Sequence, residues 1–202
     1  INKGPIIFIG NEFFDSLPIK QVFKRKKIFF EKYVGLAKGG KKIEFISKKA
    51  NKKLVSEIKK LNLAPYKGVI EYPITSIKYL KIITKIINKY NGCLLTFDYG
   101  YTKKNNQDTL QSLINHKYHD ILSKPGEADI TSHINYKLFS EVLLKNNLQV
   151  QKIVTQSEFL QKLGIIERAN ILSKNISFKE KMNIFLRLKK LLHHKEMGNL
   201  FK

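Results

Sequence analysis

Two short apolar runs, separated by a helical pattern, define the organisation of this chain. Residues 5–9 form a continuous apolar run that predicts a buried strand, and residues 93–97 predict a second one. Apolar positions at helical spacing begin near Pro73 and end at Asn91-Gly92, just before the second run. Because a strand, a helix and a parallel strand are the repeating unit of a doubly wound sheet, the pattern predicts an α/β fold.

The segment between the first strand and that helix predicts a β-rich insertion in the sheet. Residues 13–21 indicate a short helix or turn. Apolar and charged residues alternate over 22–34, which indicates strand structure. Gly39-Gly40 predicts a hairpin turn into a further strand at 43–46.

The rest of the chain reads mainly as helices around one polar region. Residues 102–133 are polar and predict a long ordered loop, and residues 149–155 predict a strand. Ser177 opens a capping-box pattern. Helical spacing predicts helices over 52–61, 136–146 and 157–163 and from residue 177 onward. With no internal repeat and no low-complexity linker, residues 1–202 are expected to form a single domain.

Carboxylates follow both predicted strands. Glu12 and Asp15 come just after the first strand, and Asp98 comes directly after the second. Ligands of open parallel sheets bind at the carboxyl ends of the strands, so these acids are expected to face one pocket. Structural roles remain open: Asp15 suits a helix N-cap, Glu12 a salt bridge to a lysine, and Asp98 an ordinary turn. Asn11 could bind a ligand or cap its own turn.

The segment 11–18, with the sequence Asn-Glu-Phe-Phe-Asp-Ser-Leu-Pro, carries a resemblance to a known family. It is similar to the mid-chain signature of the mitochondrial-dysfunction-protein-A family, which are S-adenosyl-L-methionine-dependent methyltransferases. This family includes the protein-arginine methyltransferase that assembles respiratory complex I. Further blocks agree in order, at 92–101, 108–120, 125–131, 155–165 and 196–202. The resemblance implies a Rossmann-like class I methyltransferase sheet, of which only the later half is present.

The resemblance also implies a function and a set of site residues. It implies S-adenosyl-L-methionine as the cofactor and, as the methyl acceptor, an arginine of a protein that could be a complex I subunit. Glu12, Asp15 and Asp98 would be the catalytic residues, because paired carboxylates can hold a planar guanidinium. Tyr99 would form the wall of the pocket.

Other residues of the resembling blocks are candidates for the same pocket. Asp129, Gln156 and Glu158 suit substrate contacts and structural hydrogen bonds equally well. His116 could act as a general base or fix the loop, and with His119 it also suggests a metal site. Because no second cluster with ligand spacing supports a metal, none is expected.

Composition narrows the choice of partner and compartment. The formal net charge is +22, yet only three of the 38 basic residues are arginine. Specific nucleic-acid sites favour arginine, so a solvated lysine surface is the favoured interpretation, and a charge-driven nucleic-acid binder remains a third option. The single Cys93, expected in the core, indicates a reducing compartment: the cytoplasm or, in a eukaryote, the mitochondrial matrix. No apolar run is long enough to span a membrane.

The main departure from the family is the missing cofactor half. The glycine-rich turn and the ribose-binding acid that the family implies have no counterpart, since the only glycine cluster lies in the predicted hairpin. The alternative to an enzyme is therefore a non-catalytic remnant or binding module of a split methyltransferase gene. In between lies a half-enzyme whose N-terminal half is supplied in trans. A sheet lacking strands would also expose an apolar edge and favour self-association.

Overall fold

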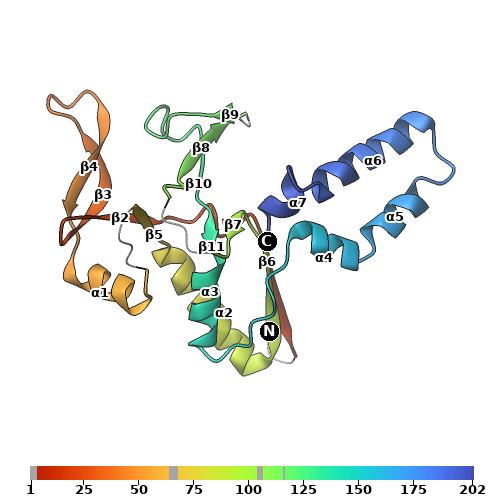
Figure 1. Cartoon of the computed structure of the whole chain (residues 1–202), viewed down its shortest axis with the longest axis horizontal. Helices are drawn as coiled ribbons and strands as arrows, with labels where there is room; N and C mark the ends of the chain where they lie inside the picture. The colour runs from red at the N-terminus through yellow and green to blue at the C-terminus, as the bar shows by residue number, and fades with distance from the viewer. Residues whose placement is uncertain (1–3, 64–67, 104–106, 116) are drawn as a thin grey trace.

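A parallel strand pair and the helix that connects it form the centre of the fold (Figure 1). The computed structural model describes residues 4–63, 68–103, 107–115 and 117–202. Strand β1 (Ile6–Asn11) pairs in parallel with β6 (Gly92–Phe97), and α2 (Ile74–Tyr90) precedes β6. The predicted strand, helix and parallel strand are confirmed, because both strands are apolar runs and Asn91, with φ 62°, ends the helix.

The insertion between β1 and α2 is β-rich, as predicted. It forms an antiparallel four-stranded sheet in the order β4-β3-β2-β5, accompanied by one helix. Residues 13–19 form turns rather than a helix, so β2 already begins at Lys20. The elements are β2 (Lys20–Arg25), β3 (Ile28–Leu36), β4 (Ile43–Lys49), α1 (Lys52–Lys60) and β5 (Val69–Tyr72).

The region predicted as a long loop contains short strands, so that prediction was wrong in part. A three-stranded antiparallel sheet forms in the order β10-β8-β9, and β7 pairs in parallel with β11. Strands of two to four residues are too short for an alternating pattern to reveal. In Figure 1 this small sheet and the β3–β4 hairpin project to the same side of the molecule. The strands are β7 (Gly100–Tyr101), β8 (Gln111–Ile114), β9 (Lys117–Tyr118), β10 (Asp129–Thr131) and β11 (Ile134–Asn135).

The core lies on one face of the β1–β6 pair. There α2 packs against α3 (Tyr136–Leu144), and Leu80 is fully buried between them and the strands. The ring of Phe14 meets that of Phe139 edge to face, with 5.2 Å between centroids. This packing anchors the turn after β1, which carries the predicted acids.

The last part of the chain is a helical arm that leaves the body of the molecule and returns to it (Figure 1). Capping boxes start two of its helices at Thr155 and Ser177, the second as predicted. Among the described residues, no helix is long and apolar enough to cross a membrane. The helices are α4 (Gln156–Lys162), α5 (Ile165–Leu172), α6 (Phe178–Leu192) and α7 (Met197–Leu200).

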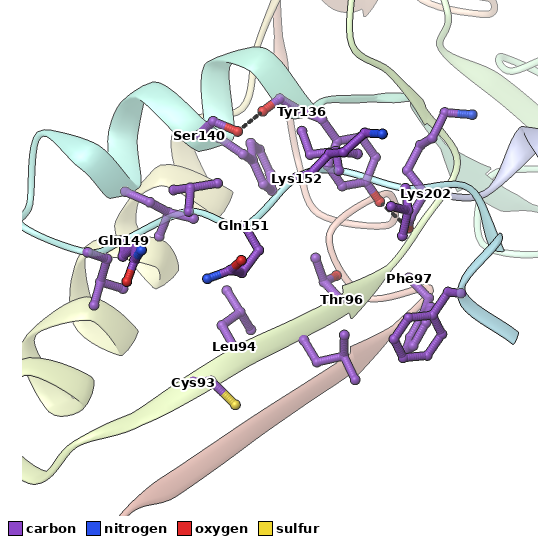
Figure 2. A pocket seen from close by; sticks show the side chains of 18 of the residues that line it. Cys93, Leu94, Thr96, Phe97, Tyr136, Ser140, Gln149, Gln151, Lys152 and Lys202 are labelled. Atoms are coloured by element: carbon purple, nitrogen blue, oxygen red, sulfur yellow. Dashed lines mark hydrogen bonds between the residues drawn. The ribbon is translucent and has the colours of Figure 1, made fainter. Parts of the chain in front are cut away.

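Two predictions next to β6 were wrong. Residues 149–155, all within the described chain, form no strand, because the segment lies beside β6 without backbone hydrogen bonds to it (Figure 2). Cys93 is exposed rather than in the core. Its side chain shares a face of the strand pair with Ile7, its register partner, which is 65% exposed. That face is uncovered, so an apolar strand position there does not imply burial.

Candidate functional site

The structure brings Glu12, Asp15 and Asp98 together beyond the carboxyl ends of β1 and β6. The backbone N–H of Asp15 donates to Oδ1 of Asp98 at 3.4 Å. The N–H of Glu12 donates to the carbonyl of Phe97 at 2.9 Å, which extends the parallel pairing by one residue. Adjacent parallel strands end at the same edge of the sheet, and for this reason the acids meet although they are far apart in sequence.

Glu12 has a strained backbone. Its φ of 48° lies in the left-handed region. For a residue other than glycine, this conformation raises the free energy by on the order of 1 kcal/mol. Here the strain bends the chain sharply at the end of β1. The bend places Asp15 against Asp98, and the N–H of Ser132 donates to the Asp15 carbonyl at 2.9 Å. Such strain is common where a turn positions functional groups.

Burial raises the pKa of all three carboxyl groups, and the charge of Asp15 adds to this effect at Glu12 and Asp98. Asp98 is fully buried, and burial, together with the neighbouring Asp15, raises its pKa to about 7 although the Thr96 hydroxyl donates to it at 2.9 Å. Burial also raises the pKa of Asp15, and burial together with Asp15 raises that of Glu12. A cation placed among these groups would therefore stabilise their charged forms.

Asp15 carries the clearest sign of an unmet interaction. The residue is 3% exposed, and its Oδ1 is buried without a hydrogen-bond partner among the residues that the structure describes. A buried carboxylate oxygen that lacks a donor costs free energy, and natural proteins rarely leave one unpaired. A ligand with N–H donors or a positive charge would satisfy it.

Tyrosines support the end of β6. The Tyr136 hydroxyl accepts a hydrogen bond from the Asp98 N–H at 3.1 Å and lies 2.9 Å from the carbonyl of Lys202. Tyr99 packs on Phe201 with 4.1 Å between ring centroids. The returning end of the helical arm therefore helps to hold the backbone that presents Asp98.

His133 lies beside the acids, although the sequence did not single it out. Its ring stacks on Tyr99 with 6.4 Å between centroids, and its environment includes the carboxylates of Asp15 and Glu71. Burial lowers its pKa, more than the two acids raise it. The sequence offered only a weak signal, namely that His133 lies two residues after the block that ends at Thr131. Among several histidines, sequence spacing favoured His116 and His119 instead.

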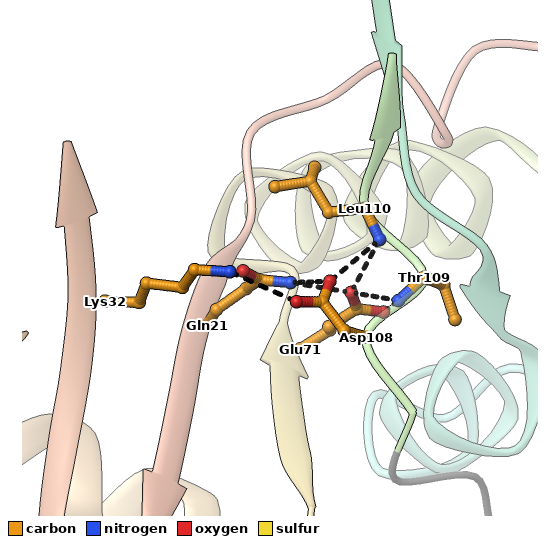
Figure 3. A network of polar contacts seen from close by, with 6 residues as sticks. All are labelled: Gln21, Lys32, Glu71, Asp108, Thr109 and Leu110. Carbon is orange, nitrogen blue, oxygen red and sulfur yellow. Dashed lines mark hydrogen bonds and ion pairs between the residues drawn. The ribbon is translucent and has the colours of Figure 1, made fainter. Parts of the chain in front are cut away.

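Figure 3 shows a polar network around Glu71 that also holds, through Thr109, the backbone of His133. The carboxylate of Glu71 accepts hydrogen bonds from the backbone N–H groups of Thr109 and Leu110 at 2.9 and 3.1 Å, and from the Thr109 hydroxyl. The same hydroxyl accepts a hydrogen bond from the His133 N–H at 2.9 Å.

The other side of the network is anchored by Asp108. It pairs with Lys32 at 3.1 Å and accepts from the side chain of Gln21 at 2.6 Å. The network therefore joins the inserted sheet to the segment that carries the histidine.

The remaining predicted site residues lie at the end of β1, in β10 and in α4, or outside the described chain. Asn11 is exposed at the end of β1, and Asp129 is exposed at the start of β10. Gln156 donates to the Leu191 carbonyl at 3.1 Å, and Glu158 closes the capping box of α4. His116 lies outside the described residues. Their functional roles stay predictions.

The described residues could contact the positively charged part of a cofactor, and they include no cradle for its nucleoside part. The buried oxygen of Asp15 suits a positively charged group, such as a sulfonium or a guanidinium. Gly39 and Gly40 lie in the turn between β3 and β4, away from any junction of a buried strand with a helix. In the described ranges, therefore, we find no glycine-rich cradle for a nucleoside. Nowhere in the described chain do three or more His, Cys, Asp or Glu side chains form a group that could hold a metal ion.

Comparisons with known proteins show the family of the chain. The family of S-adenosyl-L-methionine-dependent methyltransferases matches residues 1–154. The chain belongs to this family. Protein arginine methyltransferase NDUFAF7 of Xenopus tropicalis is 30% identical over all of this chain, and its Caenorhabditis elegans homologue is 32% identical over 83% of it. Both relatives are described as mitochondrial, and the chain covers 46% and 39% of their lengths, so it spans less than half of each.

Solved structures confirm the fold. A Burkholderia thailandensis structure described as a methyl transferase bound to S-adenosyl-homocysteine is 20% identical, with a TM-score of 0.80. A second structure from the same organism gives a TM-score of 0.81 at the same identity. Each superposes on the whole chain, which covers 53% and 55% of their lengths. The predicted methyltransferase-like α/β fold is therefore confirmed.

Proposed function

We propose that this chain carries the acceptor-binding half of an S-adenosyl-L-methionine-dependent protein-arginine methyltransferase. The observation that carries the proposal is the buried, unpartnered Oδ1 of Asp15 beside Asp98 and Glu12. A guanidinium is a planar cation with several N–H donors, and it would satisfy these acceptors better than a neutral group. The names of the relatives, protein arginine methyltransferases, support the same acceptor.

The chain's own residues would bind the arginine and accept the proton that it loses. Glu12 and Asp15 accept hydrogen bonds from two guanidinium nitrogens, which holds the cation and turns the third nitrogen toward the methyl donor. S-adenosyl-L-methionine, when bound, would supply an electrophilic methyl group on its sulfonium. The proton displaced from that nitrogen passes to His133, whose pKa is lowered by burial so that its ring is neutral at pH 7.

The charge of the chain suggests how a protein substrate would approach. With a net charge of +22, the surface repels basic segments and attracts acidic ones, while the acids at the site attract one cation. We therefore propose an arginine within an acidic or neutral segment as the acceptor. A subunit of respiratory complex I remains a candidate. The relatives are described as mitochondrial, and the mitochondrial matrix, like the cytoplasm, is a reducing compartment that suits the single cysteine.

A second candidate function is a non-catalytic binding module. It is favoured by the lack of a glycine-rich nucleoside cradle among the described residues. Such a module would keep the arginine site and lose methyl transfer. The two functions differ in whether an added cofactor-binding half restores activity.

The deciding experiment is a calorimetric titration of S-adenosyl-L-methionine into the purified chain. It is run with and without the N-terminal half of the Xenopus tropicalis relative added in trans. We expect binding only in the presence of the added half, followed by transfer of a labelled methyl group to an arginine peptide. No binding in either arm would support the non-catalytic module.

Matched variants test the acids. Asp15→Asn and Asp98→Asn should each lower methyl transfer by about 100-fold or more, because each removes a charge that stabilises the bound cation. Asp120→Asn, an exposed acid whose Oδ1 caps a turn, is the control and should leave transfer unchanged. Equal activity in all three variants would contradict the proposed role of the acids.

A further inference from the structure

The inserted sheet has one face in the core and one face outside it. Successive side chains of a strand point to opposite faces of the sheet. Val22, Phe29 and Ile70 share one face and are buried in the core. The opposite face, which we term the outer face, consists of the even-numbered residues of β3 and their register partners in β2 and β4. The structure describes all of these positions, and none of them is buried.

One end of the outer face carries cations that lie over aromatic rings. The guanidinium of Arg25 lies 5.0 Å from the ring centroid of Phe23 and 5.8 Å from that of Phe30, and the two rings stack on each other. Nζ of Lys32 lies 4.0 Å from the ring centroid of Phe45. The negative face of an aromatic ring attracts a cation. The rings therefore hold these positive charges at defined positions on the sheet.

The strands that form the outer face place no acid on it. Glu31 and Glu44, the acids of β3 and β4, occupy register positions of the opposite face. Lys32 pairs with Asp108 of another segment at 3.1 Å. Among the described residues, Arg25 has no ion-pair partner. Fixed positive charge without a matching acid selects a partner of negative charge.

The other end of the outer face is apolar and exposed. Val34 and Leu36 of β3 are 58% and 67% exposed. Their register partners on β4 are Phe45 and Ile43. Apolar side chains that lie together on a surface beside charged groups are typical of sites that bind other proteins.

The arrangement favours a protein segment over a nucleic acid. Nucleic-acid bases stack on open aromatic rings. On the outer face, Arg25 already lies over Phe23 and Phe30. The most exposed apolar side chains, those of Val34 and Leu36, are aliphatic. They offer a base no ring to stack on, whereas they can pack against the apolar side chains of a protein.

The outer face lies on the side of the inserted sheet that leads to the acid site. Lys32 points toward the segment 108–110, as does Glu71 of β5 (Figure 3). In that segment, the Thr109 hydroxyl accepts a hydrogen bond from the N–H of His133, which lies beside Asp15. A peptide bound on the outer face would therefore lie on the same side of the sheet as the acid site.

We propose that the outer face binds an extended stretch of the protein substrate in which acidic residues neighbour apolar ones. Its carboxylates would pair with Arg25 and with Lys49, the register partner of Phe30. Its apolar side chains would pack on Val34 and Leu36. That this partner is the protein that carries the acceptor arginine rests on the proposed function.

The test is the binding of a fluorescent peptide to the purified chain, followed by fluorescence anisotropy. The peptide has about nine residues, the length of β3, with glutamates in one half and leucines in the other, and it contains no arginine. Arg25→Glu should weaken binding by at least about tenfold, because it reverses a charge that faces the glutamates.

Lys24→Glu is the matched control, because it makes the same change of charge one residue away. Lys24 is exposed and lies over the ring of Phe29, on the opposite face of the sheet. This variant should weaken binding by no more than about twofold. Equal weakening by Arg25→Glu and Lys24→Glu would trace binding to the net charge and overturn the proposal, as would a failure of the peptide to bind.

A single-stranded uridine oligonucleotide distinguishes the two classes of partner. If it binds more tightly than the peptide and Arg25→Glu abolishes this binding, the outer face is a nucleic-acid site and the proposal is wrong. Because the peptide contains no arginine, a failure of the arginine site would leave the peptide measurements unchanged. The two proposals can therefore fail separately.

A second pair of variants tests the apolar end. Val34→Ser should weaken binding of the peptide by about fivefold, because it removes apolar area from the contact. Ile82→Ser is the control, since Ile82 is 53% exposed on α2, away from the inserted sheet. A peptide with serines in place of the leucines should bind the unchanged chain and Val34→Ser equally well. Equal losses from Val34→Ser and Ile82→Ser would contradict packing on the outer face.

Discussion

The two faces of the β1–β6 pair have similar apolar side chains and opposite environments. On one face, Phe8 and Leu94 pack against the core beneath α2 and α3. On the other face, Ile7 and Ile9 are 65% and 71% exposed. The comparison teaches that an apolar strand residue is buried only where another element covers its face. In this chain that element is a helix pair on one side only.

The largest expected effect comes from a cavity on the covered face. Leu80 is fully buried on α2, and Leu80→Ala should lower the free energy of unfolding by about 2–5 kcal/mol, since it removes packed methyl groups and leaves a void. Ile9→Ala on the exposed face should change it by no more than about 0.5 kcal/mol. Urea unfolding of both variants measures the difference. A similar loss in both would mean that the outer face is covered in solution.

A smaller loss of stability is expected when the Tyr136 hydroxyl is removed, because this group links the buried face to the end of β6. Tyr136→Phe should lower the free energy of unfolding by about 0.5–1.5 kcal/mol, because the Asp98 N–H and the Lys202 carbonyl each lose one hydrogen-bond partner and keep only their 3.4 Å contact with each other. Tyr118, which is 81% exposed on the small sheet, provides the control variant Tyr118→Phe. Equal stability of the two variants by urea unfolding would exclude a structural role for the Tyr136 hydroxyl.

A dependence of stability on pH should follow from Asp98. Burial raises its pKa to about 7 in the folded chain, above the ordinary value of 3.8. Between these values the folded state holds a proton that the unfolded state has lost. The contribution of Asp98 to stability is therefore complete below about pH 3.8 and disappears as the pH rises through about 7.

The measurement is the urea midpoint at pH 5 and at pH 7, for the chain and for Asp98→Asn. The midpoint of the unchanged chain should fall between pH 5 and pH 7, and the variant should show a smaller fall. An identical fall in both proteins would assign the dependence to other groups.

The smallest effect on stability is expected from the uncovered face itself. The double variant Ile7→Ser and Ile9→Ser should leave the free energy of unfolding nearly unchanged and shift the chain toward a monomer in sedimentation, because it removes exposed apolar area. Phe178→Ser on α6, where Phe178 is 79% exposed, is the matched change on a different surface. If only Phe178→Ser reduces association, the helical arm and not the strand pair is the contact.

Much of the central fold could be predicted from local patterns. The two apolar runs, the helix between them and the capping box at Ser177 depend on neighbours in sequence, and each was confirmed. The β-rich insertion could be predicted for the same reason. Strands β8 to β10 could not, because they are short and are stabilised by pairing partners and not by their own pattern.

Some residues of the site could also be predicted from local patterns, and others could not. Glu12, Asp15 and Asp98 could be predicted as site candidates, because each follows an apolar run and the carboxyl ends of parallel strands meet at one edge of the sheet. His133 could not, since its position depends on the hydrogen bond from its backbone to Thr109 and on the contact of Thr109 with Glu71. Contacts between residues so far apart in sequence leave no periodic signal.

Side-chain type and local order are enough to predict the parallel α/β unit, the acids at its edge and the family resemblance. The three-dimensional arrangement was needed to show that Cys93 is exposed, that residues 149–155 do not pair with β6, and that Oδ1 of Asp15 lacks a donor among the described residues. Burial and hydrogen bonding depend on what lies beside a residue in space, and local order does not fix that neighbour. At β6, the neighbours are β1, which pairs with it, and residues 149–155, which lie beside it without pairing (Figure 2).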